Sequence, residues 1–147
     1  MTNTINNSIL NILLVEDDEV DVMKVQRAFE AGNITNPLYI ASNGIEALEM
    51  LRGKPGQPAV VPPDRRLILL DLNMPTMNGL RFLQELRADE KIRHTTVVVF
   101  ATSNAESDKI ESYGLNVAGY IHKPTRFEEF VELLVAINNY WTLCQMN

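Results

Sequence analysis

The chain alternates short apolar runs with longer segments in which apolar residues recur periodically. Four runs of four or five largely apolar residues have the length and composition of strands buried on both faces of a sheet. These runs cover residues 12–15, 67–70, 97–100 and 117–121. A weaker extended segment covers residues 38–41, directly after a proline, which disfavours helix at the residue before it. The pattern therefore predicts five strands.

Helical periodicity occupies the segments between these runs. Three stripes repeat every three or four residues, which is the period of an amphipathic helix. Their members are Val22, Val25 and Phe29, then Ile45, Leu48 and Leu51, then Leu80, Leu83 and Leu86. Ile110 and Tyr113 indicate a shorter, more exposed helix that ends at Gly114, a suitable C-terminal cap. The longest stripe predicts a firmly docked C-terminal helix. It consists of Phe127, Phe130, Val131, Leu134, Ile137 and Trp141.

The alternation of strands and helices indicates the α/β class, with a doubly wound five-stranded parallel sheet and five helices on its two faces. Residues 1–8 are mostly polar and uncharged, so we expect a disordered tail there and one domain over residues 9–147. Residues 53–66 contain four prolines and two glycines, a composition typical of a surface loop. This Pro-rich loop is either a contact surface or a tolerated insertion.

Charge and cysteine content narrow the functional classes. The chain carries 13 Lys and Arg residues against 19 Asp and Glu residues, a formal net charge of −6. No broad attraction to nucleic acid or anionic lipid is therefore expected. One cysteine, Cys144, cannot form an intrachain disulfide. The chain also lacks a secretory signal and any apolar run near the ~20 residues that cross a bilayer. We expect a cytoplasmic protein.

Charged residues stand directly after three of the predicted strands. Glu16, Asp17 and Asp18 follow the first run, Asp71 follows the run at 67–70, and Lys123 follows the last run. In an open parallel sheet, ligands bind beyond the carboxyl ends of the strands. We therefore expect these residues, which are far apart in the sequence, to converge at one edge of the sheet.

Several carboxylates at one edge repel one another unless a cation relieves the repulsion. Mg²⁺ is the natural partner, because it prefers oxygen ligands. Asp71 could then act as a nucleophile toward phosphorus, while the ion and Lys123 offset charge on the transferring phosphoryl group. Each feature alone has a simpler interpretation. Residues 16–18 could start a helix, Asp71 could begin a turn, and Lys123 could be a solvated charge.

The set of motifs resembles the response-regulator receiver family. The matching segments are residues 12–18, residues 69–75 with Gly79 after them, and residues 120–124, within a resemblance that extends over residues 9–141. The resemblance implies a flavodoxin-like or CheY-like sheet with the strand order 2-1-3-4-5. It also implies a phosphoacceptor that assists its own phosphorylation and dephosphorylation, rather than an enzyme.

The same resemblance assigns roles to individual residues. Asp71 would be the phosphoacceptor, with a sensor histidine kinase as the donor. Glu16 and Asp17 would serve Mg²⁺, together with Asp71 and the backbone carbonyl of Asn73. Lys123 would bind the phosphoryl group.

Tyr120 falls on the aromatic switch position, which in the family turns inward on phosphorylation. Core packing at the end of the last strand is an alternative interpretation, and both can hold together. Where the family usually carries a Thr or Ser hydroxyl, this chain has Ala101, and alanine cannot hydrogen-bond a phosphoryl oxygen. Thr102 is one residue late, so strand alternation points its side chain away. We expect weakened or altered switching. The alternative function is a receiver-fold interaction module that switches independently of phosphorylation.

A closer resemblance is to the small receivers that partner phytochrome-type histidine kinases. It rests on the Pro-rich loop, on residues 97–103 and on the helix end at residues 139–141. It implies a phytochrome-like kinase as partner and a homodimer formed through the last strand and helix, with Tyr140 and Trp141 as contacts. The same two aromatic residues could instead pack the helix end on its own domain.

Two classes that share the predicted topology are disfavoured. An aspartyl-phosphate phosphatase commonly needs a second acid two residues after its nucleophile, where this chain has Asn73. A flavodoxin-like FMN binder needs a loop rich in Ser, Thr or Gly after the first strand, where this chain has three acids.

Overall fold

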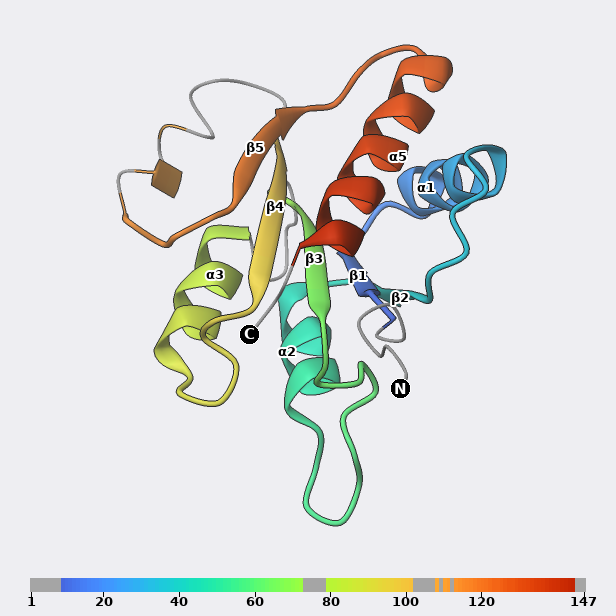
Figure 1. Cartoon of the computed structure of the whole chain (residues 1–147). Coiled ribbons are helices and arrows are strands. Elements are labelled where there is room, and N and C mark those ends of the chain that lie inside the picture. Colours follow the sequence, from blue (N-terminus) through green and yellow to red (C-terminus); the bar gives the residue numbers. More distant parts are fainter. Residues whose placement is uncertain (1–8, 73–78, 102–107, 109, 112, 145–147) are drawn as a thin grey trace.

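The fold is a parallel sheet between two layers of helices (Figure 1). The computed structural model describes residues 9–72, 79–101, 108, 110–111 and 113–144. Within these residues, five parallel strands form one sheet in the order β2-β1-β3-β4-β5. The strands are β1 (Asn11–Val15), β2 (Leu38–Ala41), β3 (Arg66–Asp71), β4 (Thr96–Ala101) and β5 (Gly119–His122). The predicted fold class and strand order are confirmed.

Four helices lie in the described part of the chain, against the five that the sequence predicts. They are α1 (Glu19–Ala31), α2 (Gly44–Arg52), α3 (Gly79–Ala88) and α5 (Phe127–Leu143). The further helix expected around Ile110 falls on a segment in which residues 102–107, 109 and 112 lie outside the described residues. Gly114, the expected C-terminal cap, has a φ of 62° in the left-handed region that favours glycine.

Each face of the sheet carries its own hydrophobic cluster, because successive residues of a strand point to opposite faces. Leu13 and Ile68 pack with Phe82 on the side of α2 and α3. Leu14 and Leu69 pack on the other side, which α1 and α5 cover (Figure 1). Burial on both faces explains why β1 and β3 are almost continuously apolar.

The expectation of full burial is wrong for the last strand. β5 begins at Gly119 rather than at residue 117, and its residues are half-buried or exposed. The reason is its position at the edge of the sheet, where β4 is its neighbour on one side. Two expected stripe residues are also exposed, Ile45 by 48% and Phe127 by 42%. They stand at the first turns of α2 and α5, beyond the buried faces of these helices.

An arginine from a distant loop holds the C-terminal end of α5. Arg65 has a φ of 49°. Its guanidinium donates hydrogen bonds to the carbonyl oxygens of Trp141, Thr142 and Cys144 at 2.8, 3.1 and 3.2 Å. Carbonyls at a helix end lack intrahelical partners, and the last turn of α5 has no basic residue of its own. Arg65 therefore caps α5 and joins it to the loop before β3.

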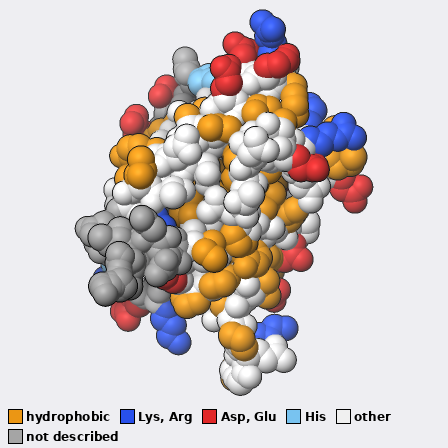
Figure 2. All heavy atoms as spheres, turned by 45° about the vertical axis from the view of Figure 1, so that its right-hand side comes forward, with side chains coloured by type: hydrophobic (Ala, Val, Ile, Leu, Met, Phe, Trp, Pro, Cys, Tyr) orange, Lys and Arg blue, Asp and Glu red, His pale blue; other side chains and the backbone are white. Residues whose placement is uncertain are grey.

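The surface carries charges of both signs. On the face that Figure 2 shows, acidic and basic side chains are interspersed, and the described Lys and Arg residues form no continuous basic surface there. The Pro-rich loop extends between α2 and β3 (Figure 1) and includes an isolated bridge between Lys54 and Gln57. Among the described residues, none of the helices combines the length and apolar character that a membrane span requires.

Candidate functional site

The register of the sheet brings two acids to one edge. Val15, the last residue of β1, pairs with Leu70 of β3, so the residues that follow them, Glu16 and Asp71, stand at the same level. The amide of Glu16 continues the ladder by donating to the carbonyl of Ala41 at 3.0 Å. Both acids are buried, with exposed side-chain fractions of 3% for Glu16 and 7% for Asp71. The expected convergence of these strand ends is confirmed.

Helix α1 places a third acid beside them. Asp18 is the N-cap of α1, and its side chain accepts hydrogen bonds from the amides of Val20 at 2.8 Å and Asp21 at 3.4 Å. This capping is the simpler interpretation of an acid at that place, and it is correct for Asp18. It also starts α1 so that Asp21 lies in the first turn, close to the strand ends.

The cation of the site is Lys123, which follows β5. Its Nζ lies 3.1 Å from Oδ2 of Asp71, 3.4 Å from Oε1 of Glu16 and 3.7 Å from Oδ2 of Asp21. The parallel order places it there, because Ala101 of β4 pairs with His122 of β5 and Asp71 pairs with Phe100 of β4. One ammonium group thus contacts acids from three separate elements.

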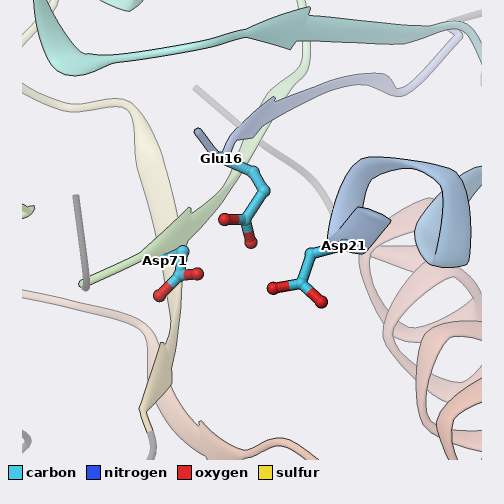
Figure 3. Close-up of side chains that lie close together, drawn as sticks. All are labelled: Glu16, Asp21 and Asp71. Atoms are coloured by element: carbon cyan, nitrogen blue, oxygen red, sulfur yellow. The ribbon is translucent and has the colours of Figure 1, made fainter. Parts of the chain in front are cut away.

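The three carboxylates face one another (Figure 3). One oxygen from each of Glu16, Asp21 and Asp71 lies within 4.8 Å of the others, a spacing at which they could share a metal ion. Asp17, which the sequence places in the acidic pair, is exposed and does not belong to this group. Asn73 lies outside the described residues. The group therefore contains Asp21, an acid to which the sequence analysis gave no role.

Burial and mutual repulsion shape the electrostatics of the site. Burial, followed by the hydrogen bond with Asp71 and the charge of Asp71, raises the pKa of Glu16 from 4.5 to about 8. Burial alone would lower the pKa of Lys123, but the charges of Asp71 and Glu16 outweigh it and raise this pKa. Burial therefore disfavours the charged form of Glu16, whereas the neighbouring acids favour the charged form of Lys123.

The donor set fits a hard divalent cation. Three carboxylates supply oxygen atoms alone, which are the ligands that Mg²⁺ and Mn²⁺ prefer over softer metals. Such an ion would take the place of the proton on Glu16. Its positive charge would offset the mutual repulsion of the three carboxylates around Lys123. The chemistry of these residues thus supports a divalent cation site at this edge.

A small cavity adjoins the site. Its volume is about 70 Å³, and it lies between α1 and the segment that follows β5. Glu16, Asp21 and Lys123 border it on the polar side, while Phe100 and Phe130 close it on the apolar side. The side chain of Lys123 therefore borders open space on one side and its carboxylate partners on the other.

The expected switch residues lie along β4 and β5. Ala101 ends β4 with 1% of its surface exposed, and Thr102 is outside the described residues. Tyr120 pairs with Val99 and packs against the cluster beneath α2 and α3. Burial, with a smaller effect of the charge of Glu111, raises the pKa of its hydroxyl. The core-packing interpretation of Tyr120 therefore agrees with the structure.

Gly79, the first residue of α3, lies against the backbone of Leu72. A Cβ atom added to Gly79 would lie 2.9 Å from Cα of Leu72, closer than real Cβ atoms approach. The amide of Gly79 also donates to the carbonyl of Leu72 at 3.4 Å. The backbone of Gly79 therefore approaches Leu72, the residue next to the candidate phosphoacceptor, too closely for any side chain but that of glycine.

The expected dimer contacts lie at the end of α5. Tyr140 is 60% exposed, and its ring meets that of Trp141 edge to face, with centroids 4.8 Å apart. Both rings border a groove of about 340 Å³ over β5 and α5. Its floor is apolar and includes Gly119, Ile121 and Ile137.

Asp21 and Arg65 were missed by sequence reasoning. A signal existed for Asp21, because it stands three residues after a helix N-cap, at the position where a side chain turns back toward the start of the helix. No local signal existed for Arg65, whose partners are more than seventy residues away in the chain.

Comparison with known proteins agrees with this geometry. The profile of the response regulator receiver domain matches residues 12–135. The probable methanogenesis regulatory protein FilR2 of Methanothrix harundinacea is 35% identical over 130 residues, which cover 88% of this chain and 82% of FilR2. Response regulator Rcp1 of Synechocystis is 33% identical over 130 residues, which cover 88% of this chain and 87% of Rcp1.

Solved structures show the same likeness. The phosphorylated cyanobacterial phytochrome response regulator RcpA has a TM-score of 0.77 at 31% identity, with 95% of this chain and 98% of RcpA covered. The Mn²⁺-bound form of Rcp1 has a TM-score of 0.73 at 32% identity, with 92% of this chain and 96% of Rcp1 covered. With a matching profile over most of its length and these relatives, the chain belongs to the response regulator receiver domain family.

Proposed function

We propose that the protein is a response regulator that accepts a phosphoryl group on Asp71 from a sensor histidine kinase. The observation that carries the proposal is the contact of Lys123 Nζ with Asp71 Oδ2 at 3.1 Å, beside the second buried acid Glu16 at the carboxyl edge of the sheet. A buried acid paired with a lysine at this edge is suited to receive and hold a phosphoryl group.

The transfer is a displacement at phosphorus. An oxygen of Asp71 forms the new P–O bond, and the bond from phosphorus to the donor breaks, so that the leaving group departs with the electron pair. Lys123 offsets the charge of the phosphoryl oxygens, because its ammonium already lies beside the acceptor oxygen. The protein is the acceptor and assists its own phosphorylation and dephosphorylation, rather than acting as an enzyme on another substrate.

Mg²⁺ is the metal of this proposal. Glu16 and Asp71 supply buried oxygens, Asp17 stands beside Glu16 at the edge, and the backbone carbonyl of Asn73 completes the proposed ligand set. When bound, the ion would neutralise charge on the transferring group. Support comes from the buried carboxylate oxygens of Glu16 and Asp71 and from the Mn²⁺-bound form of the related Rcp1.

A phytochrome-like kinase is the proposed donor, because RcpA and Rcp1 are similar over almost the whole chain and RcpA is a phytochrome response regulator. A homodimer through β5 and α5 belongs to the same proposal. It is supported by the apolar groove beside Tyr140 and Trp141. We infer a cytoplasmic location from the single cysteine and the dependence on a kinase.

The alternative is an interaction module that keeps the receiver fold but switches without phosphate. Ala101 favours this alternative, because the buried end of β4 offers no hydroxyl to a phosphoryl group. The close pairing of Lys123 with Asp71 favours phosphorylation instead, because an interaction surface alone does not require a buried acid and a lysine in contact.

Incubation with acetyl phosphate and Mg²⁺, followed by intact mass measurement, separates the two functions. The wild type is expected to gain the mass of one phosphoryl group, and Asp71→Asn is expected to gain none. Asp108→Asn is a matched control, because it removes an exposed acid elsewhere in the chain. No mass gain in the wild type would favour the interaction module.

A further inference from the structure

Asp21 is the third acid around Lys123, and the proposed phosphotransfer assigns it no role. It comes from α1, whereas Asp71 comes from β3 and Glu16 from the end of β1. Its Oδ2 lies 3.7 Å from Nζ of Lys123, against 3.1 Å for Asp71. The ammonium therefore has partners from three different elements.

The partners of Lys123 differ in exposure. The side chains of Glu16 and Asp71 are almost fully buried, whereas 32% of the Asp21 side chain is exposed. The other oxygen of Asp21 lies 3.9 Å from Nζ of Lys24, whose side chain is 62% exposed. Asp21 thus stands at the solvent border of the site, between two lysines.

A divalent ion and the Lys123 ammonium compete for the same oxygens. The positive charges of the ion and of the ammonium would repel each other strongly if both stayed beside the buried oxygens of Asp71 and Glu16. Occupation of these oxygens by a metal ion therefore requires the ammonium to move away from them. The ammonium must nevertheless remain near Asp71, because it is needed beside the phosphoryl group.

We propose that Asp21 is a positioning residue that holds the Lys123 ammonium at the border of the site when a divalent ion occupies Glu16 and Asp71. This inference rests on the proposed phosphoacceptor function and describes how its cations are arranged. Asp21 keeps the Lys123 ammonium near Asp71, where the phosphoryl group would arrive. It also keeps the ammonium out of contact with the oxygens of Glu16 and Asp71 that bind the ion. Metal affinity thereby depends on Asp21 through Lys123.

The structure offers room for this displacement. The cavity of about 70 Å³ is bordered by both Asp21 and Lys123, so the lysine side chain can shift toward α1 without moving the core. The distances require only a small shift, since both carboxylates already lie within 4 Å of Nζ. The N-cap bonds of Asp18 fix the first turn of α1 and keep Asp21 in place.

A double-mutant cycle on Mg²⁺ binding tests the inference. The Kd for Mg²⁺ is measured by NMR titration of the unphosphorylated protein for the wild type, Asp21→Asn, Lys123→Met and the double variant. Asp21→Asn is expected to raise the Kd about fivefold, the effect of losing one partly exposed ion pair. In the Lys123→Met background, the same change is expected to alter the Kd by at most about twofold.

Two further variants control for charge and shape. Glu19→Gln removes a charge from the same turn of α1 outside the carboxylate group, and is expected to leave the Kd within about twofold of wild type. Asp21→Glu keeps the charge on a longer side chain that still reaches Lys123, and is expected to restore most of the affinity. Rescue by glutamate excludes misfolding as the cause.

Equal effects of Asp21→Asn in both backgrounds would overturn the inference, because Asp21 would then act on the ion directly. An unchanged Kd in Asp21→Asn would overturn it as well. These outcomes are independent of phosphorylation, so the acetyl phosphate experiment can fail while the cycle succeeds. A wild type that binds no Mg²⁺ at millimolar concentration would refute both the metal site and this role of Asp21.

Discussion

Glu16 is the residue at which burial and charge conflict most strongly. It is 3% exposed and lies with Asp71 and Asp21 around a single ammonium group. Burial and the nearby Asp71 raise its pKa to about 8. Such a group costs stability when it ionises in the folded protein, and a bound cation offsets this cost.

The protein is therefore expected to lose stability as the pH rises from about 5 to 8 in the absence of divalent ions. The folded state holds the Glu16 proton in this range, whereas the unfolded state, with a pKa near 4.5, has released it. The loss is at most about 1.4 kcal/mol per pH unit. Lys123 does not contribute in this window, since its raised pKa lies above 10.5 and its stabilisation is lost only beyond that value.

Urea unfolding of wild type and Glu16→Gln at several pH values in EDTA measures the effect. Glutamine has a similar shape but does not titrate. The free energy of unfolding of the variant is therefore expected to fall less with rising pH than that of the wild type. Added Mg²⁺ is expected to stabilise the wild type more at pH 8 than at pH 6, because the ion binds the ionised acid. Parallel curves for both proteins would contradict the raised pKa.

At the scale of elements, β5 lies at one edge of the sheet with α5 beside it. β5 is an edge strand with a neighbour on one side, and an unpaired strand edge favours association with another chain. The end of α5 is held in place by Arg65, so the rings of Tyr140 and Trp141 are presented beside this edge on a fixed helix. A rigid aromatic pair next to an apolar groove is typical of an interface.

Tyr140→Lys is expected to convert the proposed dimer to a monomer, because it places a charge in an apolar contact. Sedimentation velocity at several protein concentrations measures the change. Tyr113→Lys is the matched control, since Tyr113 is similarly exposed, at 52% against 60% for Tyr140, and does not border the apolar groove. Identical sedimentation of wild type and Tyr140→Lys would show that these rings pack the helix end alone.

At the scale of the whole molecule, the proposed function requires a signal from Asp71 to cross the sheet before it can reach Tyr120. Asp71 is at the end of β3, Ala101 ends the neighbouring β4, and Tyr120 lies on β5 beyond it. Val99, which pairs with Tyr120, is two residues before Ala101, so both point to the same face of the sheet. A hydroxyl at residue 101 would stand between the proposed phosphoacceptor and the cluster that holds Tyr120.

Ala101→Thr is therefore expected to strengthen the response of Tyr120 to a phosphoryl mimic. The measurement is the NMR shift change at Tyr120 with and without the mimic, for wild type and variant. Ala101→Val is the control, because valine has the shape of threonine without its hydroxyl. Both variants add atoms to a site that is 1% exposed and lose about 1–3 kcal/mol of stability. Identical responses in all three proteins would remove Ala101 as the cause of altered switching.

The order of the elements could be predicted from the sequence because it depends on local pattern. Within the described residues, apolar runs and helical stripes identified the five strands and the four helices near their observed bounds. The exposure of β5 could not be predicted in the same way. Its composition resembles that of a buried strand, and its place at the edge follows from strand order rather than from its own residues.

The same division applies to the site. Glu16, Asp71 and Lys123 were identifiable from sequence, because Asp71 ends a strand, Glu16 and Lys123 directly follow strands, and parallel strands end at one edge. Tertiary structure alone decided that Asp21 joins this group while Asp17 turns to solvent, and that Arg65 caps a helix that begins more than sixty residues later. The pattern of apolar and polar residues indicates which segments are helices or strands and where they end. The contacts of Asp21 and Arg65 depend instead on how α1 and α5 pack against the sheet.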